Sequence, residues 1–219
     1  MMKEMNEQPA VLGDLLTSLI DPMARKATLP SVPIDWKKLP KLTILGCGTA
    51  YLAGLVGKYW FEKIARLPVE VDIASEFRYR NPIINKETVV LAISQSGETA
   101  DTLAAMEEAR HKGATLWTIV NAIGSQAMRI ADGYIAMQTG PEIGVASTKA
   151  FTAPLVDLYM LAILLADLRE SIDSKTRHKL VADLRLVPDL VGQCLDREPG
   201  VQAAALALKD TNHCLYLGR

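Results

Sequence analysis

Three short loops, rich in glycine and hydroxyl residues, hold the side chains best suited to chemistry in this chain of 219 residues. The densest is Ser94–Thr99, which places three hydroxyls and one amide side chain directly before a predicted helix. Such neutral donors, together with the free N–H groups of a helix start, can surround a phosphate without any lysine. Ordinary N-capping by Ser96 or Thr99 is the alternative, but capping needs only one such residue. The pattern therefore favours a phosphate site.

The loop Gly46–Tyr51 also leads from a predicted strand into a predicted helix, where an anion is favoured. It superficially resembles a dinucleotide-binding fingerprint, but Tyr51 stands where the third glycine would be needed for close packing. A tight turn, with Cys47 as a small buried hydrophobe, is the simpler interpretation. A nicotinamide dinucleotide site with Asp72 as the ribose-binding acid stays open as an alternative.

The third loop, which runs from Gly140 into another predicted helix, offers less direct chemistry. Gly144 would let the backbone approach a ligand, and Ser147 could reach a substrate hydroxyl. We expect Thr148 to cap the helix. Glu142 and Lys149 are expected to be solvated or paired surface charges. Together the three loops predict a site for a small phosphorylated, polyhydroxylated ligand such as a sugar phosphate, and none of them supplies a convincing general base.

Charge and composition exclude several other classes of protein. The chain has 24 Lys+Arg against 25 Asp+Glu, a net charge of −1, so no basic excess points to nucleic acid or to an anionic membrane. Its 49% hydrophobic and 22% charged residues are typical of a globular protein. The cysteines and histidines are scattered, which argues against a disulfide scaffold, a zinc ribbon and a metal cluster; no metal or cofactor is expected. They are Cys47, Cys194 and Cys214, and His111, His178 and His213.

A parallel sheet is the element that would bring the three loops together. Short apolar runs predict five strands, at 42–45, 69–73, 88–93, 115–120 and 133–137. Helical patterns at 51–65, 99–111 and 126–130 lie between strands, and a fourth at 149–168 follows the last strand. Apolar strands that alternate with helices are typical of an α/β fold with a doubly wound parallel sheet. In such sheets ligands bind beyond the carboxyl ends of the strands, which is where these loops begin.

The segments on either side of the sheet predict helical extensions. An amphipathic stretch, Val11–Ile20, and a connector punctuated by prolines form an N-terminal arm over 1–40, which leads into a subdomain over 41–170. The prolines are Pro22, Pro30, Pro33 and Pro40.

After the sheet, a helical connector is expected over 171–212, with helices at Ser174–Cys194 and Val201–Lys209. A final apolar run predicts a strand within 213–219, the first of a second subdomain that is cut short, because a parallel unit needs a crossover helix.

Nothing in the sequence indicates a membrane span or export. The longest apolar stretch, Ala150–Leu168, contains Asp157 and Asp167, whose charges favour a buried helix. The N-terminus lacks the basic region and apolar core of a secretory signal, so a cytoplasmic location is expected.

Three motifs resemble the first sugar isomerase (SIS) subdomain of the glucosamine-6-phosphate synthase family, also named glutamine–fructose-6-phosphate aminotransferase (isomerizing). They are Cys47-Gly48-Thr49, Ser94–Leu103 and Glu142–Thr152. Shorter likenesses extend the resemblance over essentially the whole chain: Glu7-Gln8-Pro9, Ala74–Arg80 and Leu215–Arg219. The resemblance implies an SIS-type doubly wound sheet of five parallel strands flanked by helices, with N-terminal and C-terminal helical extensions.

The resemblance also implies a binding site for fructose 6-phosphate or glucosamine 6-phosphate. Its phosphate ligands would be Ser94, Gln95, Ser96 and Thr99, with Cys47, Gly48 and Thr49 beside the sugar, Val145 in contact with it, and Ser147 as a weaker member. Where the family usually has a serine after Cys-Gly-Thr, this chain has Ala50, so one hydrogen bond to the ligand is expected to be missing or replaced.

The family makes glucosamine 6-phosphate from fructose 6-phosphate and glutamine, with a glutaminase domain and paired SIS subdomains. The family's base glutamate, ring-opening histidine and Schiff-base lysine lie beyond the point that matches Gly218-Arg219, so this chain is expected to bind without turnover. Because SIS domains of this family commonly pair, the resemblance also implies a homodimer. Two alternatives stay open: a stand-alone SIS isomerase or deaminase, and a non-enzymatic module that senses sugar phosphates. Against the sensing module, the chain shows neither the helix-turn-helix segment nor the basic patch of a transcription regulator.

Overall fold

The computed structural model describes residues 1–21, 23, 26–27, 34–215 and 217. Five parallel strands form one sheet in the order β4-β3-β5-β6-β7. Their bounds are β3 (Leu42–Gly46), β4 (Val69–Ile73), β5 (Val89–Ser94), β6 (Thr115–Val120) and β7 (Gly133–Ala136). The predicted α/β sheet is confirmed, and its strand order reverses between β3 and β5, the place where ligands bind in such folds.

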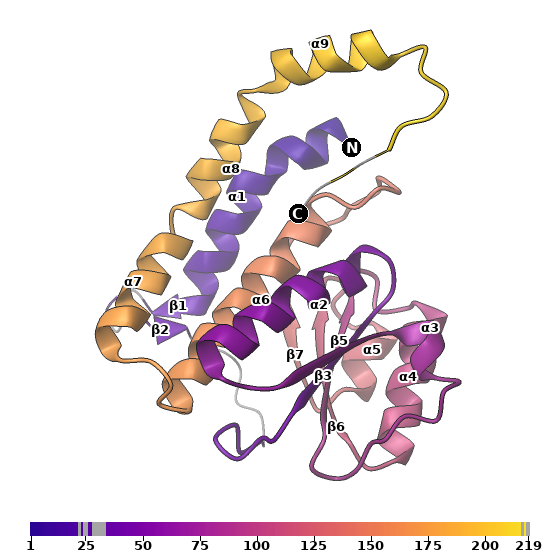
Figure 1. Cartoon of the computed structure of the whole chain (residues 1–219), viewed down its shortest axis with the longest axis vertical. Coiled ribbons are helices and arrows are strands. Elements are labelled where there is room, and N and C mark those ends of the chain that lie inside the picture. The colour runs from indigo at the N-terminus through magenta and orange to yellow at the C-terminus, as the bar shows by residue number, and fades with distance from the viewer. Residues whose placement is uncertain (22, 24–25, 28–33, 216, 218–219) are drawn as a thin grey trace.

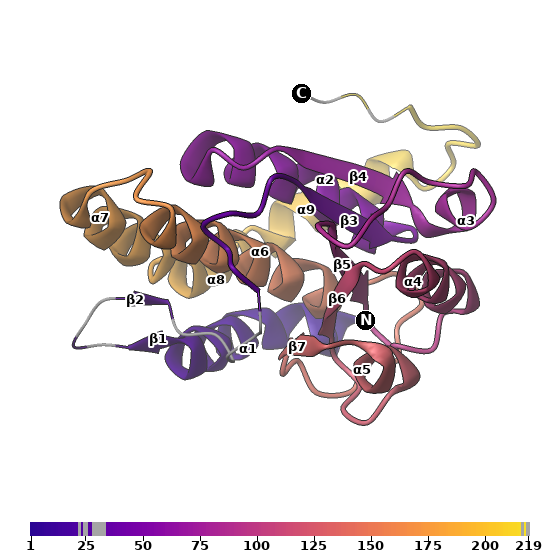
Figure 2. The same ribbon diagram turned by 90° about the horizontal axis from the view of Figure 1, so that it is seen from below.

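The central strands are buried on both faces because helices cover both sides of the sheet (Figures 1 and 2). Alternate residues of β5 point into two separate cores. Val89, Leu91 and Ile93 belong to the larger core, and Val90 and Ala92 to the smaller one.

Different helices cover the two cores. Helices α2 (Thr49–Trp60) and α6 (Lys149–Leu168) pack together on the first face, with α1 (Met2–Leu19) alongside α6. The other face carries α3 (Ala74–Phe77), α4 (Ala100–His111) and α5 (Gln126–Ile130).

The N-terminal arm is more helical than its sequence predicts. Helix α1 begins at Met2 instead of Val11 and contains Pro9. Proline has no N–H for the carbonyl four residues earlier, which is that of Met5. The side-chain amide of Gln8 donates to that carbonyl at 3.1 Å, so the helix keeps this bond in another form. A short antiparallel pair, β1 (Ile20–Asp21) and β2 (Lys26–Ala27), follows, and Pro22, Pro30 and Pro33 lie outside the described residues.

The helix predicted at 51–65 is two elements, because α2 ends at Trp60 and Phe61–Ala65 forms a π-helical turn, η1. The helix predicted at 174–194 is also divided, into α7 (Ser174–Leu184) and α8 (Val187–Leu195). Pro188 lies in the first turn of α8 and cannot donate to the carbonyl of Leu184, so the earlier helix ends there.

The C-terminal segment departs further from its prediction. Helix α9 (Glu198–Leu208) has no buried residue. Residues 213–215 and 217 are not in a strand, contrary to the expectation for 213–219, and Tyr216, Gly218 and Arg219 are not among the described residues. A strand needs a neighbour for its N–H and C=O groups. The division of the chain at 40, 170 and 212 stays a prediction.

Helix α6 is buried in the fold, as predicted. Among the described residues it is the one helix long and apolar enough to cross a membrane by length and composition, yet it packs against α1, α2 and η1. Asp157 in this helix is fully buried, and neither of its carboxylate oxygens has a hydrogen-bond partner. Burial alone raises the pKa of Asp157 well above its ordinary value.

Candidate functional site

A cavity of about 200 Å³ lies at the carboxyl ends of β3 and β5, between the three loops that the sequence singled out. Every predicted site residue except Gly48 lines it. The complete lining is Cys47, Thr49, Ala50, Ile93, Ser94, Gln95, Ser96, Thr99, Thr102, Met137, Glu142, Gly144, Val145, Ser147 and Ala150. The tertiary structure thus brings side chains from 47 to 150 into one small space.

The loop after β5 is folded back on itself and is fixed by contacts within the loop and with the start of α5. The Gly97 amide donates to Ser94 Oγ at 3.0 Å, and Ser94 Oγ lies 3.5 Å from Thr99 Oγ1. Gly97 has a φ of +64°, and a Cβ there would lie 2.1 Å from Ser125 Oγ. Glu98 accepts a hydrogen bond from the Gln126 amide at 2.8 Å, which ties the loop to the start of α5. Only glycine fits at position 97.

The helix starts around the cavity are not capped by their own side chains. The N-cap residues are Gly48 for α2, Thr99 for α4 and Thr148 for α6, and none makes a side-chain capping bond. The capping alternative for Thr99 is therefore wrong. The Ser96 hydroxyl accepts from the Glu98 amide at 3.2 Å, which is a turn within the loop. The amides at the starts of α2 and α4 thus remain without a side-chain cap beside the cavity, where they favour an anion.

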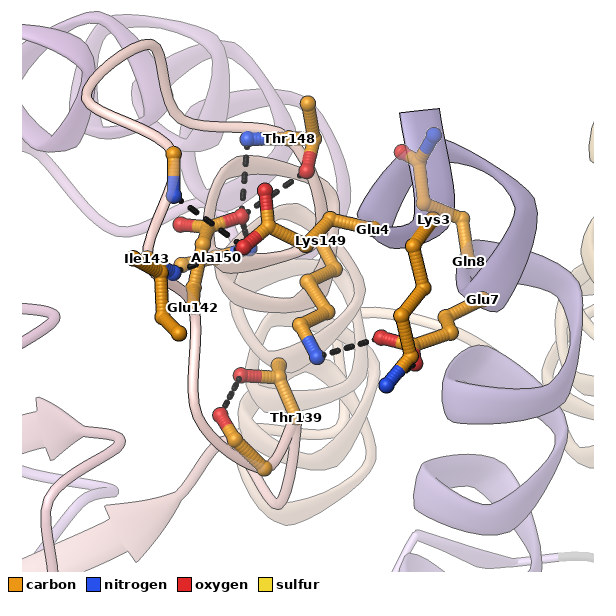
Figure 3. Close-up of polar contacts among 12 residues, drawn as sticks. Lys3, Glu4, Glu7, Gln8, Thr139, Glu142, Ile143, Thr148, Lys149 and Ala150 are labelled. Atoms are coloured by element: carbon orange, nitrogen blue, oxygen red, sulfur yellow. Dashed lines mark hydrogen bonds and ion pairs between the residues drawn. The ribbon is translucent and has the colours of Figure 1, made fainter. Parts of the chain in front are cut away.

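The loop before α6 is organised by Glu142, which corrects two expectations (Figure 3). One carboxylate oxygen accepts from the Thr148 amide and the Thr148 hydroxyl, both at 2.9 Å, and from the Ala150 amide at 3.3 Å. The other accepts from the Ser147 hydroxyl at 3.3 Å. Glu142 is therefore the cap of α6 and not a surface charge, and Thr148 donates to the cap instead of capping.

The lysine of the same loop is also not a surface charge. The Lys149 side chain is only 4% exposed, and its Nζ lies 2.7 Å from a carboxylate oxygen of Glu7 in α1 (Figure 3). Asn121 fixes the beginning of the loop, because its side chain accepts from the Thr139 amide at 3.0 Å and donates to the Gly140 carbonyl at 2.8 Å. Burial of a cation is tolerated here because the opposite charge is paired with it.

Thr102, at the wall of the cavity, is not among the predicted site residues, although the sequence carries a signal for it. Thr102 lies three residues after Thr99 and so shares a helix face with it. Its hydroxyl is 3.7 Å from Cys47 Sγ, which connects α4 to the first loop. Ala50 lies in the wall too, where its methyl group supplies no hydrogen bond.

The arrangement suits binding of an anion by neutral groups. No lysine or arginine is among the lining residues, and the one ionisable carboxylate, Glu142, has both oxygens engaged. In the part of the chain that the structure describes, no group of three His, Cys, Asp or Glu side chains could hold a metal ion. Hydroxyl, amide and helix-start donors are the groups that a ligand would meet.

The cavity is small for a dinucleotide. Pockets for drug-sized ligands typically measure roughly 300–1,000 Å³, and this cavity is smaller. Asp72, which would have held the ribose, forms an ion pair with Arg80 at 2.6 Å and accepts from the Ile73 amide at 2.9 Å. Its carboxylate is thus already engaged.

Comparison with known proteins agrees with the fold and with the motifs. The glutamine–fructose-6-phosphate aminotransferases [isomerizing] of Clostridium tetani and Brucella abortus are 45% and 46% identical to the chain over its whole length. The chain covers only 36% of each of them. In structure it matches the C-terminal domain of glucosamine-fructose-6-phosphate aminotransferase from Francisella tularensis, with 34% identity and a TM-score of 0.94, over 100% of this chain and 61% of that one.

These matches confirm the predicted resemblance to the isomerase half of this enzyme family. The chain spans about a third of the length of the curated relatives that it matches. The SIS domain profile matches residues 36–164, the stretch that holds the whole five-stranded sheet and all three loops. Because this match covers more than half of the chain, the chain belongs to the SIS domain family.

Proposed function

We propose that this chain is the sugar-phosphate-binding part of the isomerase domain of a glutamine–fructose-6-phosphate aminotransferase. Fructose 6-phosphate or glucosamine 6-phosphate would occupy the cavity, with the phosphate held by the Ser94–Thr99 loop and the sugar beside Cys47, Thr49 and Val145. The similarity over the full chain to enzymes of that name supports the assignment.

One observation carries the proposal more than any other. Hydroxyls and an amide side chain gather between the uncapped starts of α2 and α4, in a cavity lined by neither lysine nor arginine. A phosphate can accept hydrogen bonds from all these donors at once, while an uncharged sugar would leave many of them without a partner. The expected ligand is therefore a phosphorylated sugar and not a free one.

Catalysis belongs, in this proposal, to a longer parent protein. Proton transfer next to a carbonyl needs a positioned base, and the only acid in the cavity, Glu142, is occupied as a helix cap. We expect the chain by itself to bind sugar phosphate without isomerising it. A homodimer and a cytoplasmic location are further parts of the proposal; light scattering of the purified chain tests the dimer.

Calorimetric titration tests the binding. We expect fructose 6-phosphate to bind and free fructose to bind far more weakly. The double variant Ser96→Ala/Thr99→Ala should weaken fructose 6-phosphate binding by about tenfold or more, because hydrogen bonds to a charged group are each worth about 1.5–3 kcal/mol.

A matched control removes two hydroxyls outside the cavity, with the variant Ser174→Ala/Thr211→Ala, both of which are exposed. It should bind like the unchanged chain. Equal affinity for fructose and fructose 6-phosphate, or full binding by the Ser96→Ala/Thr99→Ala variant, would refute the phosphate assignment.

A further inference from the structure

The start of α1 reaches across to the loop before α6 and holds its backbone (Figure 3). One carboxylate oxygen of Glu4 accepts from the Ile143 amide at 2.6 Å and from the Gly144 amide at 3.0 Å. The hydrogen bond from Ile143, the Met1 amine and the hydrogen bond from Gly144 together lower the pKa of Glu4 to about 2. The carboxylate is thus charged at neutral pH, and its bonds to the two amides are charge-assisted.

Two further contacts join the same helix to the same region. Glu7 pairs with the buried Lys149 at 2.7 Å, and the Thr152 hydroxyl donates to the Gln8 side chain at 3.1 Å. Glu4, Glu7 and Gln8 are thus spaced along α1 so that they meet the loop and the first turn of α6 in sequence. The helix lies outside the residues that match the SIS domain profile, yet it contacts a loop inside them.

The fit between Glu4 and Gly144 is close. A Cβ at Gly144 would lie 2.6 Å from a carboxylate oxygen of Glu4. Gly144 does not have a positive φ, so the approach of the carboxylate, and not the backbone conformation, favours glycine here. The same glycine lines the cavity.

Apolar burial does not fix this loop. Ile143 is 88% exposed, and Val145 is fully exposed although it lies at the cavity wall. A loop whose apolar side chains are in solvent depends on polar contacts for its conformation. Glu142 supplies those contacts at the start of α6, and Glu4 supplies them between Glu142 and Val145.

We propose that Glu4, assisted by Glu7, is a positioning residue for the cavity: it holds residues 142–147 in the conformation that presents Gly144, Val145 and Ser147 to the sugar phosphate. The inference rests on the proposed function, since it assigns to α1 a role in binding of that same ligand. Glu4 does not touch the ligand; it acts through the loop backbone.

Two measurements on the full chain test this role. Calorimetry with fructose 6-phosphate should show binding at least about fivefold weaker for Glu4→Ala. Glu4→Gln keeps an acceptor oxygen without the charge and should recover part of the loss. Hydrogen exchange without ligand should become faster over 139–149 in Glu4→Ala while exchange over 94–99 stays unchanged, because Glu4 bonds to the backbone of the loop before α6 and not to that of the Ser94–Thr99 loop. Glu7→Gln should give a smaller change of the same kind.

Asp14→Asn is the matched control, because Asp14 is an exposed carboxylate of α1 and makes no hydrogen bond or ion pair with any residue that the structure describes. It should leave affinity and exchange unchanged. If Glu4→Ala does not fold, Glu4→Gln and Glu7→Gln decide the question by the same two measurements.

Several results would overturn the inference: equal affinity of Glu4→Ala and the unchanged chain, an equal loss in Asp14→Asn, or exchange that rises equally over both loops, which would indicate general destabilisation. Failure of the unchanged chain to bind fructose 6-phosphate is a different result; it overturns the proposed function, and this inference with it.

Discussion

The two halves of the cavity are built in different ways. The Ser94–Thr99 loop leaves a central, fully buried strand, and it is held by bonds within itself and to the segment between β6 and α5 that lies beside it. The loop before α6 leaves a short edge strand, β7, and is held by Glu4, which is 139 positions away from Ile143. One wall of the site is therefore held by the sheet and its adjoining segments, and the other is held by the N-terminal helix α1.

This difference has a consequence for binding. A loop on a buried strand that is bonded to neighbouring segments of the same sheet keeps its shape as long as the sheet is folded. A loop held by a distant helix can open when that helix shifts, without unfolding of the sheet. We expect the wall formed by the Ser94–Thr99 loop to be rigid and the wall formed by the loop before α6 to be adjustable.

The largest expected effect is the loss of unfolding free energy in Gly97→Ala, which alters the Ser94–Thr99 loop. The φ of +64° and the contact with Ser125 should together cost about 2–4 kcal/mol of unfolding free energy, measured by urea denaturation. Gly124→Ala is the control, because Gly124 has a φ of +80° but nothing within 4 Å of an added Cβ. It should lose only about 1 kcal/mol. Equal losses would show that Ser125 does not constrain the loop.

A smaller loss of stability is expected for Glu142→Ala in the adjustable wall. The variant removes the acceptor for two amides at the start of α6, and loss of a helix cap typically costs about 1–2 kcal/mol. Thermal or urea unfolding measures it, with the exposed Glu107→Ala as the control. A loss as large as that of Gly97→Ala would contradict the division between a rigid and an adjustable wall.

The smallest effect is a pH dependence that distinguishes the two loops. The pKa of Glu4 is lowered from 4.5 to about 2, so its contribution to stability is fully present above pH 4.5 and is lost as pH falls toward 2. In NMR spectra the amide shifts of Ile143 and Gly144 should therefore stay constant through pH 4.5 and move only at lower pH. The amide of Gly97, which donates to a hydroxyl, should not titrate with them. Titration of the Gly144 amide near pH 4.5 would mean that Glu4 does not hold the loop.

Much of the fold could be predicted because the signal is local. The apolar runs at 42–45, 69–73, 88–93, 115–120 and 133–137 each became a strand of the sheet, within a residue or two at the ends. The burial of β5 on both faces explains why such a run is recognisable. The helix boundaries were less certain: Pro188 ended a helix that periodicity alone continued, while Pro9 was accommodated by the neighbouring Gln8.

The environment of the charged residues near the site could not be predicted from the sequence. The expectation that Glu142 and Lys149 are surface charges rests on their own neighbours in the sequence, where a charge is usually solvated. In the structure Glu142 caps a helix and Lys149 is buried against Glu7. The partner of a charge is a property of the packed chain, and no local pattern records it.

The sequence by itself determined the sheet and the hydroxyl-rich loop Ser94–Thr99. A run of buried strand residues and a cluster of hydroxyls before a helix are both patterns that lie within a few residues of the chain. Only the tertiary structure decided which side chains complete the cavity. Thr102 comes to its wall from α4, Met137 from the loop after β7, and Ala150 from α6. Glu4 reaches the loop because α1 packs along α6, and that packing depends on burial of apolar surface summed over the whole chain.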